Sequence, residues 1–556
     1  MSTQRWHVAP RPSPALLLIP AVALVAGIYL SLRWTTTGTE YINAITGAND
    51  LRTPVLATIT ITAAIGLVLA IAIAATYTRW TRRPAAIRHR FLHSPGWQPR
   101  PRRAENSRRG VASKLAFLLP TAHRPTVADA AVVLGKDARG KDVYLACDES
   151  MLVIGPPGSG KDRRVAIPVL RSWPGPALVT STKVDLAAAT ITERTARGPI
   201  AVFDPAGFGL TTNSPDDVTT PPATGHDPIS ALRWDPIRGC ADKDVAARRG
   251  AAIVAGGTPT MSEQFWSVAA TRILRAVLHA ADLEHASIID AASWATSVPG
   301  WITASEILHA HGETEWATAL RDDAELDPRT SSSITATLTG TLIGTSNARL
   351  RQALVLAPGE DSVDLRDLLA ASGTIYAVAP AEPDSHLVFR PWTTLLASEV
   401  AAVLREMAHG RRLEPPALLL LNELVHVCPL PELPGLLADG RGHNIATLAI
   451  VQDPAQLAAR FSREEADAIT AAAQHRLLLS AGGDATAKEW SELIGTYRRA
   501  TTSRQHKAMG LTSTGSSISA DDAPIMPANE LRHLPYGCAV MLPRGATPTP
   551  LQLNGH

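Results

Sequence analysis

The chain has 556 residues, of which 45% are hydrophobic and 19% charged, a composition typical of a folded protein of two to four domains with an apolar segment attached. Its four cysteines are widely spaced and share no ligand pattern with each other or with histidine, which argues against a zinc or iron–sulfur protein and favours thiols in a reducing compartment. The net charge of +2 is unevenly distributed along the chain. Residues 79–109 contain ten arginines and one acid, and the rest of the chain is mildly acidic.

Two uncharged runs near the N-terminus, residues 15–32 and 54–77, predict membrane-spanning helices. As helices they would measure roughly 27 Å and 36 Å, against a hydrocarbon layer of about 30 Å. A cleaved signal peptide is the alternative for the first run, but a secreted protein would not need the second. The arginines after residue 77 place that side in the cytoplasm. We therefore expect a two-pass protein of the inner or plasma membrane, with a cytoplasmic segment 1–14, an external loop 33–53 and both termini cytoplasmic.

The next segment, residues 78–125, is a basic cytoplasmic linker by this interpretation. Within it, the stretch Arg79–Arg109 contains prolines, among them Pro84 and Pro95, that predict an extended chain. A row of arginines beside a membrane span is typical of contact with anionic lipid. The same charges would also bind DNA phosphates. Membrane lipid is the favoured partner, and DNA stays open.

A phosphate-binding loop is the clearest motif of the chain. The octapeptide at 155–162 follows the apolar run Met151–Ile154 and precedes Val165–Leu170, the strand–loop–helix setting of a P-loop. Glycines let the backbone turn its N–H groups toward phosphate oxygens at a helix N-terminus, and Lys161 would reach the β- and γ-phosphates. The usual Mg²⁺-binding Ser or Thr at the last position is Asp162. The predicted nucleotide-binding residues are Gly155, Pro156, Pro157, Gly158, Ser159, Gly160, Lys161 and Asp162.

Beyond the P-loop, short apolar runs alternate with helical stretches. This pattern predicts an α/β fold with a parallel-rich sheet wrapped by helices. The segment Leu511–Asp522 is rich in Ser, Thr and Gly, which predicts a mobile loop. The expected strands are Val143–Cys147, Met151–Ile154, Ala177–Thr180, Ile200–Phe203, Thr374–Ala379, Ala417–Leu421, Ala446–Val451, Arg476–Leu479 and Cys538–Leu542.

An interruption in this alternation predicts an inserted domain. No strand is expected between Asp204 and Asp361, whereas Phe265–Leu278 and Ser331–Leu342 carry apolar residues at helical spacing. The simplest interpretation is an all-α insertion within a nucleotide-binding domain. The expected bounds are 126–210 and 361–556 for the two parts of the nucleotide-binding domain and 211–360 for the insertion.

The run Ala417–Leu421 ends in Asn422 and Glu423 and completes the predicted nucleotide site. A P-loop works with a second strand that ends in an acid for the Mg²⁺ shell and an acid that polarises the attacking water. Glu423 supplies the second acid, so Lys161 and Glu423 are the candidate catalytic residues. The metal-side position is an amide, so the candidate Mg²⁺ ligands are Asp162 and Asn422.

The two departures, Asp162 and Asn422, have two interpretations. A usual site offers Mg²⁺ one hydroxyl and one carboxylate, and this chain offers one carboxylate and one amide oxygen. In a compensated site, ligand number and charge are retained and Mg–ATP is still hydrolysed. In a decayed site, Asp162 repels the γ-phosphate. Arg163 and Arg164, which follow directly, would neutralise that carboxylate or the phosphates.

Two further residues are candidates for sensing and completing the site. Gln452 ends the apolar run Ala446–Val451, a place where RecA-like motors hold a sensor of the γ-phosphate; a strand-end glutamine without function is the alternative. Arg441 lies in a glycine-flanked stretch before this strand. It is a candidate arginine finger that would reach a neighbouring subunit, and an ordinary surface arginine is equally compatible with the sequence.

Taken together, these segments resemble the coupling ATPases of type IV secretion and bacterial conjugation, of the TraG/TraD kind. The P-loop leads into Ile167–Leu170 as in that family, and Phe265-Trp266 is similar to the opening of its all-α domain. The most specific similarity runs from Leu420 to Pro434 and on to Val451-Gln452. Asp162 and Asn422 depart from the family pattern.

The resemblance implies a RecA-like, membrane-anchored motor with ATP and Mg²⁺ as cofactors. Such proteins form rings, usually homo-hexamers, that recruit a relaxase–DNA complex or protein substrates to a type IV secretion channel. The all-α insertion is implied to recognise the substrate. Candidate DNA contacts outside the linker are Arg498, Arg499, Arg504 and Lys507.

Two other functions are compatible with the sequence. One is a hydrolysis-deficient, nucleotide-binding membrane adaptor that docks cargo. The other is a double-stranded DNA pump like those of cell division and sporulation. Such pumps often have more spans and a winged-helix tail, for which the residues after Leu542 leave no room.

Overall fold

The structure is a computed structural model that describes residues 84–97, 105–210, 229–257, 264–380, 383–504 and 516–555, together with Val68 and Ala72. The chain divides into two compact units, residues 1–94 and 95–556. The predicted spans 15–32 and 54–77 lie outside the described residues, except for Val68 and Ala72, which are helical.

The basic linker is not extended where the structure describes it. Helix α3 spans Pro84–Leu92 and helix α4 spans Arg108–Leu118. Pro84 stands at the first helical position, where its missing N–H has no partner to lose, so this proline starts a helix instead of preventing one. The side chain of Ser107 caps α4 by accepting from the N–H of Gly110. The prediction of an extended chain over 79–109 was therefore wrong for Pro84–Leu92, while α4 lies almost wholly beyond that stretch.

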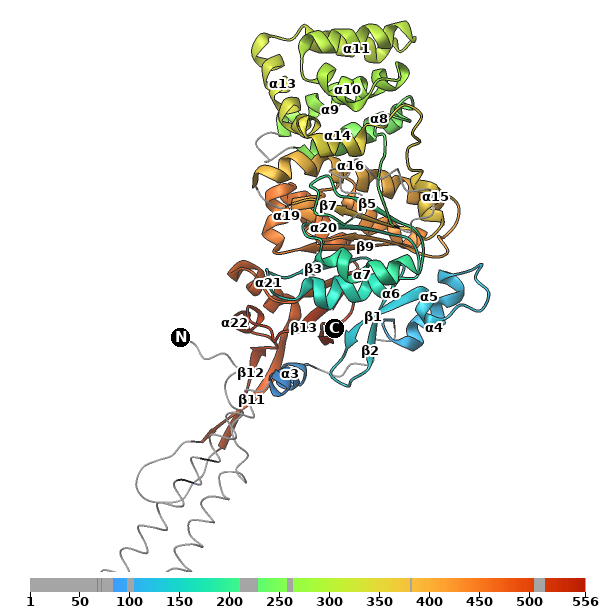
Figure 1. The fold of residues 1–556 in the computed structure, drawn as a ribbon. Coiled ribbons are helices and arrows are strands. Elements are labelled where there is room, and N and C mark those ends of the chain that lie inside the picture. Colours follow the sequence, from blue (N-terminus) through green and yellow to red (C-terminus); the bar gives the residue numbers. More distant parts are fainter. Residues whose placement is uncertain are drawn as a thin grey trace, which may run out of the picture. The chain divides into compact units, whose positions relative to one another are not determined.

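One twelve-stranded sheet forms the centre of the second unit (Figure 1). Eight neighbouring strands, from β10 to β6, run parallel, and the other four continue the sheet antiparallel. In spatial order the strands are β2 (Asp142–Ala146), β1 (Ala131–Lys136), β14 (Thr549–Leu553), β13 (Cys538–Pro543), β10 (His475–Leu478), β3 (Met151–Ile154), β9 (Ile445–Val451), β8 (Ala417–Leu421), β4 (Ala177–Ser181), β7 (Thr374–Val378), β5 (Ile200–Phe203) and β6 (Ile229–Ala231).

Helices cover both faces of the parallel part. Every residue of β3, β8 and β9 is buried, and neighbouring residues in a strand point to opposite faces, so neither face is left to solvent. One face forms a core cluster with α6 (Ile167–Ser172) and α7 (Asp185–Thr195). The remaining helices of this part are α5 (Val127–Ala130), α16 (Pro383–Met407), α17 (Leu424–Val427), α18 (Leu433–His443), α19 (Pro454–Arg460), α20 (Arg463–Ala472), α21 (Asp484–Ile494) and α22 (Ala528–Leu531).

Consecutive helices fill the stretch between β6 and β7, and Figure 1 shows those from α8 to α14 stacked beyond α16, with α15 beside the sheet. The predicted helices Phe265–Leu278 and Ser331–Leu342 are confirmed within α9 and α13. Helix α8 packs against both α9 and α16. The elements are α8 (Lys243–Gly257), α9 (Gln264–Leu283), α10 (Ile288–Ala295), α11 (Val298–Ala310), α12 (Thr314–Ala324), α13 (Pro328–Leu342), the 3₁₀ turn η3 (Ile343–Ser346), α14 (Ala348–Leu354) and α15 (Leu365–Ala370).

Helix α16 is long and apolar enough to cross a membrane. Among the described helices it is the one that meets this criterion, over Leu387–Met407. Its apolar window is 78% buried inside the protein. Trp392, Leu395 and Val400 of this helix are almost completely enclosed, so the apolar character serves packing against α8 and the sheet.

The nine strands expected from the sequence are confirmed, with ends that agree or differ by one residue. Two expectations were wrong. Strand β6 lies in the interval where no strand was expected, because a three-residue edge strand is too short to show a pattern. Strand β12 (Ser516–Pro524) covers most of the predicted mobile loop, since it pairs along its whole length with β11 (Thr496–Arg504) and the backbone ladder does not depend on apolar side chains.

A buried arginine ties α7 to two strands. Arg194 is fully enclosed, and burial lowers the pKa of its guanidinium to about 10. It donates to the Trp173 and Gly175 carbonyls at 2.8 and 2.6 Å and to the Thr374 hydroxyl at 2.8 Å. These acceptors stand beside the starts of β4 and β7, so one side chain fixes the helix to the sheet.

We expect Arg194→Ala to destabilise the protein by about 3 kcal/mol, because two buried carbonyls lose their donors. The measurement is the thermal unfolding midpoint of the detergent-solubilised protein, which should fall by roughly 5 °C. The control is Arg197→Ala on the same helical end, where the side chain is exposed. Equal midpoints for the two variants would contradict the anchoring role of Arg194.

Candidate nucleotide site

The P-loop adopts a tight turn directly after β3. The Gly155 N–H donates to the Val451 carbonyl at 3.1 Å and extends the pairing of β3 with β9 by one residue. Gly158 and Gly160 have φ of 78° and 94°, a region that only glycine occupies without strain. The Ser159 N–H closes the turn onto the Pro156 carbonyl at 3.2 Å. The glycines of the motif are therefore required by the backbone.

The helix after the loop begins with a π-helical turn, Asp162–Ala166. Pro168 has no N–H to give to the carbonyl of Arg164, and its ring would crowd that carbonyl in an ordinary α-turn. The Ile167 N–H instead bonds to the Asp162 carbonyl, one residue further back than in an α-helix. This wider turn sets Lys161 and Asp162 at the mouth of the loop.

A chain of contacts across the ends of three strands joins Lys161, Glu423 and Gln452. Lys161 is 7% exposed, and its Nζ lies 3.5 Å from Glu423 Oε1. Gln452 Nε2 donates to the other oxygen, Oε2, at 2.9 Å. The contact arises because β3, β9 and β8 are parallel neighbours, so the residues after each strand emerge at one edge of the sheet. The three residues predicted from separate motifs are thus brought together.

Glu423 is held in an unusual backbone conformation. Its φ of 53° and ψ of 44° are left-handed, which costs a residue with a side chain about 1 kcal/mol or more. It ends the turn between β8 and α17. Strain of this kind persists where the surroundings dictate it, here between the Lys161 ammonium and the Gln452 amide.

The two atypical residues are in direct contact. Asn422 Nδ2 donates to Asp162 Oδ1 at 3.1 Å. Asn422 is 2% exposed, and the Thr180 hydroxyl donates to its backbone carbonyl at 3.2 Å. Burial of the carboxyl raises the pKa of Asp162, Glu423 raises it further, and Lys161 and the Asn422 amide oppose the shift.

The donor set at this position fits a magnesium ion. The Asn422 Oδ1 is buried and has no hydrogen-bond partner among the described residues, although a buried amide oxygen normally has one. Together with the Asp162 carboxylate it offers two hard oxygens, the ligand type that Mg²⁺ prefers. The Ser159 hydroxyl, on the loop itself, is another buried oxygen without a partner in the described chain.

Arg441 lies away from these residues. It stands near the end of α18 and donates through Nε to Asp148 Oδ2 at 3.2 Å. Asp148 precedes β3, so this ion pair lies at the edge of the sheet opposite the P-loop. Burial raises the pKa of the Asp148 carboxyl, and Arg441 opposes that shift. Within one chain Arg441 therefore does not reach the nucleotide site, and its role toward a neighbouring subunit stays a prediction.

Comparison with known proteins shows the family of the chain. A family model described as type IV secretory system conjugative DNA transfer matches residues 119–552. The chain belongs to this family. The predicted resemblance to conjugative coupling proteins is therefore confirmed. No curated protein matches the chain.

Solved structures similar to this conjugative DNA transfer protein share its fold. The unbound monoclinic form of the bacterial conjugative coupling protein TrwBdeltaN70 is 15% identical, with 80% of this chain and 91% of that chain covered and a TM-score of 0.55. The plasmid coupling protein TrwB in complex with the non-hydrolysable GTP analogue GDPNP is 14% identical, with 73% and 86% covered and a TM-score of 0.51. At these identities the likeness shows the fold alone, a RecA-like α/β architecture with a parallel-rich sheet.

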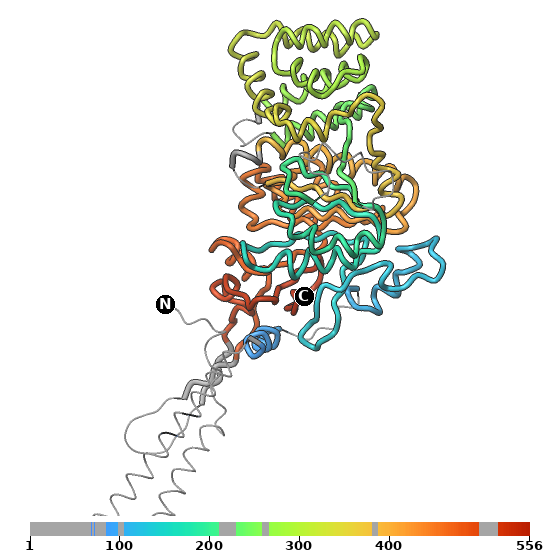
Figure 2. Tube along the Cα trace, viewed as in Figure 1, coloured from blue at the N-terminus to red at the C-terminus, as the bar shows by residue number. Residues whose placement is uncertain are grey.

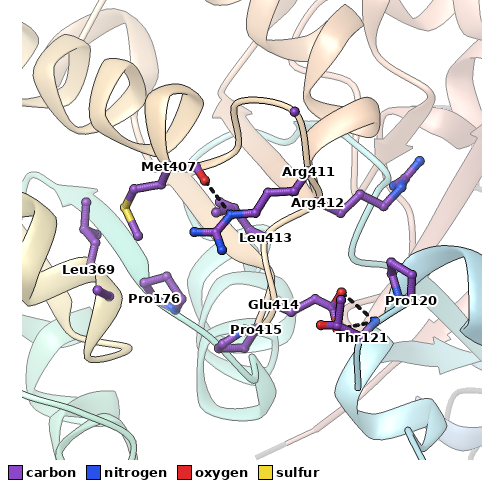
Figure 3. Close-up of a pocket in the computed structure, with 12 residues that line it drawn as sticks. Pro120, Thr121, Pro176, Leu369, Met407, Arg411, Arg412, Leu413, Glu414 and Pro415 are labelled. Carbon is purple, nitrogen blue, oxygen red and sulfur yellow. Dashed lines mark hydrogen bonds between the residues drawn. The ribbon is translucent and has the colours of Figure 1, made fainter. Parts of the chain in front are cut away.

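A separate cavity of this coupling-family protein lies at the edge opposite the P-loop. It has a volume of about 400 Å³ and is lined by Pro176, which directly precedes β4, and by Pro415, which lies two residues before β8. Figure 3 shows the Glu414 carboxylate accepting from the Thr121 N–H, a bond of 3.0 Å. None of the predicted nucleotide-binding residues lines it, so this cavity is not the nucleotide site.

Arg164 contacts the C-terminal segment. Its guanidinium lies 5.0 Å from the ring centroid of Tyr536 and donates to the Asn554 carbonyl at 3.3 Å. A contact of this arginine with phosphate stays a prediction. Tyr536 itself was not predicted as part of the site. No local signal marks it, because its position depends on the pairing of β13 with β10, which are about 60 residues apart in sequence.

Proposed function

We propose that this conjugative DNA transfer protein is a membrane-anchored coupling ATPase. It would recruit DNA, a relaxase–DNA complex or protein substrates to a type IV secretion channel and drive their transfer by hydrolysing ATP. The observation that carries the proposal is the convergence of Lys161, Glu423 and Gln452 at the P-loop edge. That TrwB, a protein of the same fold, was solved in complex with a GTP analogue supports nucleotide binding by this chain.

The contacts assign a role to each side chain. The Lys161 ammonium neutralises the β- and γ-phosphates and exchanges its Glu423 partner for them. Glu423, then released from the lysine, polarises the attacking water. Gln452 donates to the second Glu423 oxygen and so orients this catalytic carboxylate toward the position of the γ-phosphate. Asp162 and Asn422 would hold Mg²⁺, which would supply positive charge beside the phosphates.

Several finer features belong to the same proposal. We propose a homo-hexameric ring in which Arg441 approaches the site of the neighbouring subunit. Helices α8 to α14 lie within the proposed all-α insertion, 211–360, which would contact the substrate. The two proposed spans would hold the ring at the membrane, with lipid along the basic linker.

Strands β11 and β12 are weak candidates for DNA contact. Arg498 pairs in register with Asp522, and Arg499 with Asp521. Cross-strand partners lie side by side on one face, so each arginine stands next to an aspartate and the local charge is close to neutral. Lys507 lies outside the described residues. DNA contact is therefore better sought on the basic linker or the loops that line the ring.

The decisive experiment is ATP turnover by the full-length protein in detergent, with and without single-stranded DNA. A coupling motor should hydrolyse ATP and turn over several-fold faster with DNA, because DNA engages the ring. Bound ATP without turnover would favour the hydrolysis-deficient adaptor. Stimulation by duplex DNA and not by single strands would favour the pump of the cell-division type. Negative-stain images of the same sample test the ring.

A further inference from the structure

The order of strands divides the P-loop edge into two sides. Glu423 and Gln452 follow β8 and β9, on one side of β3. On the other side lie β10 and then β13. Since Glu423 and Gln452 mark the end of the nucleotide where the γ-phosphate reacts, the nucleoside must leave the loop toward β10 and β13. A side chain at the P-loop edge of β13 would therefore lie next to the nucleobase.

Tyr536 stands at that edge. Strand β13 is antiparallel to β10, so its first residue, Cys538, lies at the same edge as the P-loop and Tyr536 precedes it by two residues. A Cβ added at Gly160 would lie 3.1 Å from Tyr536 Cε2, which shows that the ring edge rests on the P-loop backbone. The aromatic side chain is thus a neighbour of the phosphate-binding turn.

The Tyr536 ring contacts its neighbours on one part of its surface and is exposed to solvent on the rest. The Arg164 guanidinium lies 5.0 Å from the ring centroid, a cation–π contact. Arg164 is itself held by the Asn554 carbonyl, and a Cβ at Gly555 would come within 2.5 Å of its Nη1, so the C-terminal strand end packs over it. Yet Tyr536 is 51% exposed. A half-exposed aromatic ring that contacts the phosphate-binding loop offers a flat apolar surface on which a planar ligand can stack.

We propose that Tyr536, backed by Arg164, is the subsite for the base of the bound nucleoside triphosphate. The inference rests on the proposed ATP site and deepens it. The base stacks on the exposed part of the ring, and the arginine behind the ring holds it in position. Stacking on an aromatic side chain needs only a π-face, so the subsite takes any base but favours the larger surface of a purine. The phenol hydroxyl has no part in stacking, and phenylalanine should replace tyrosine.

The experiment compares two ligands, Mg–ATP and inorganic tripolyphosphate with Mg²⁺, bound to the full-length protein in detergent by calorimetry. Tripolyphosphate fills the P-loop without offering a base. Tyr536→Ala should weaken ATP binding by roughly fivefold to 150-fold and leave tripolyphosphate binding within about twofold. Tyr536→Phe should bind ATP as the native protein does. Phe117→Ala, which removes an aromatic ring that is 58% exposed elsewhere, is the matched control and should change neither affinity.

The outcomes separate the subsite from the ATP site itself. If Tyr536→Ala binds ATP as tightly as the native protein, or loses ATP and tripolyphosphate alike, the base subsite is refuted. In the first case Lys161→Ala, which removes the phosphate partner, would still abolish binding of both ligands and leave the proposed function standing. If the native protein binds neither ligand, the proposed ATP site fails and the subsite fails with it.

Discussion

Glu423→Gln is expected to reduce ATP turnover roughly 100-fold or more while ATP remains bound. The amide keeps the size of the side chain and its place between Lys161 and Gln452, but it cannot accept the proton of the attacking water. Loss of the carboxylate also removes the negative partner of Lys161, so the ammonium is freer to bind phosphate and affinity for ATP should not fall. The measurements are steady-state phosphate release and equilibrium ATP binding on the same sample.

The matched control for this change is Glu464→Gln, which neutralises an exposed carboxylate on α20. Its turnover should equal that of the native protein. Lys161→Ala provides the opposite pattern, because it removes the phosphate partner and should abolish binding together with turnover. If Glu423→Gln turns over ATP at the native rate, Glu423 is not the base and the chain of contacts through Gln452 has another purpose.

The nucleotide edge could be foreseen because its residues follow strands that the sequence itself marks. The runs Met151–Ile154 and Ala417–Leu421 are so uniformly apolar that their burial on both faces was predictable, and all of their residues are buried. Parallel strands then bring their C-terminal ends to one edge, which places Lys161 beside Glu423 without any knowledge of side-chain geometry. The sequence placed Asp162 and Asn422 at one ion, but the hydrogen bond between them could not be foreseen, since it depends on the side-chain conformations that direct the amide N–H toward the carboxylate.

Elements without an apolar pattern escaped prediction for a physical reason. Strand β12 is built from Ser, Thr, Ala and Asp, and its partner β11 supplies the hydrogen bonds that hold it. Strands β1 and β14 pair with each other although they lie near opposite ends of the second unit, and Figure 2 shows the end of the chain beside the early strands. Pairing of this kind is decided by the tertiary structure, and so is the position of Tyr536 at the P-loop.

Asn422→Asp alone is expected to lower ATP turnover by about tenfold or more, because it sets two carboxylates against each other where the amide now donates to Asp162 at 3.1 Å. Burial and Glu423 already raise the pKa of Asp162, and the substitution replaces an amide that lowers this pKa with a second negative charge that raises it. Asp162→Thr alone removes the one carboxylate from the proposed Mg²⁺ ligands. Its turnover should also fall, by roughly tenfold, and require more Mg²⁺.

The double variant, Asp162→Thr with Asn422→Asp, should recover native turnover or exceed it, because one hydroxyl and one carboxylate are again presented to Mg²⁺. Two tenfold losses that cancel correspond to a coupling free energy of about 2.7 kcal/mol, at the upper end of what residues in contact show. The measurement is turnover against Mg²⁺ concentration for all four proteins, with Asp467→Asn, an exposed aspartate on α20, as the control for loss of one charge. Neutral single variants would mean that the two residues do not share an ion, and the compensated site would have to be abandoned. Losses that add instead of cancelling would mean that each residue acts alone, with the carboxylate required at position 162 and the amide at position 422.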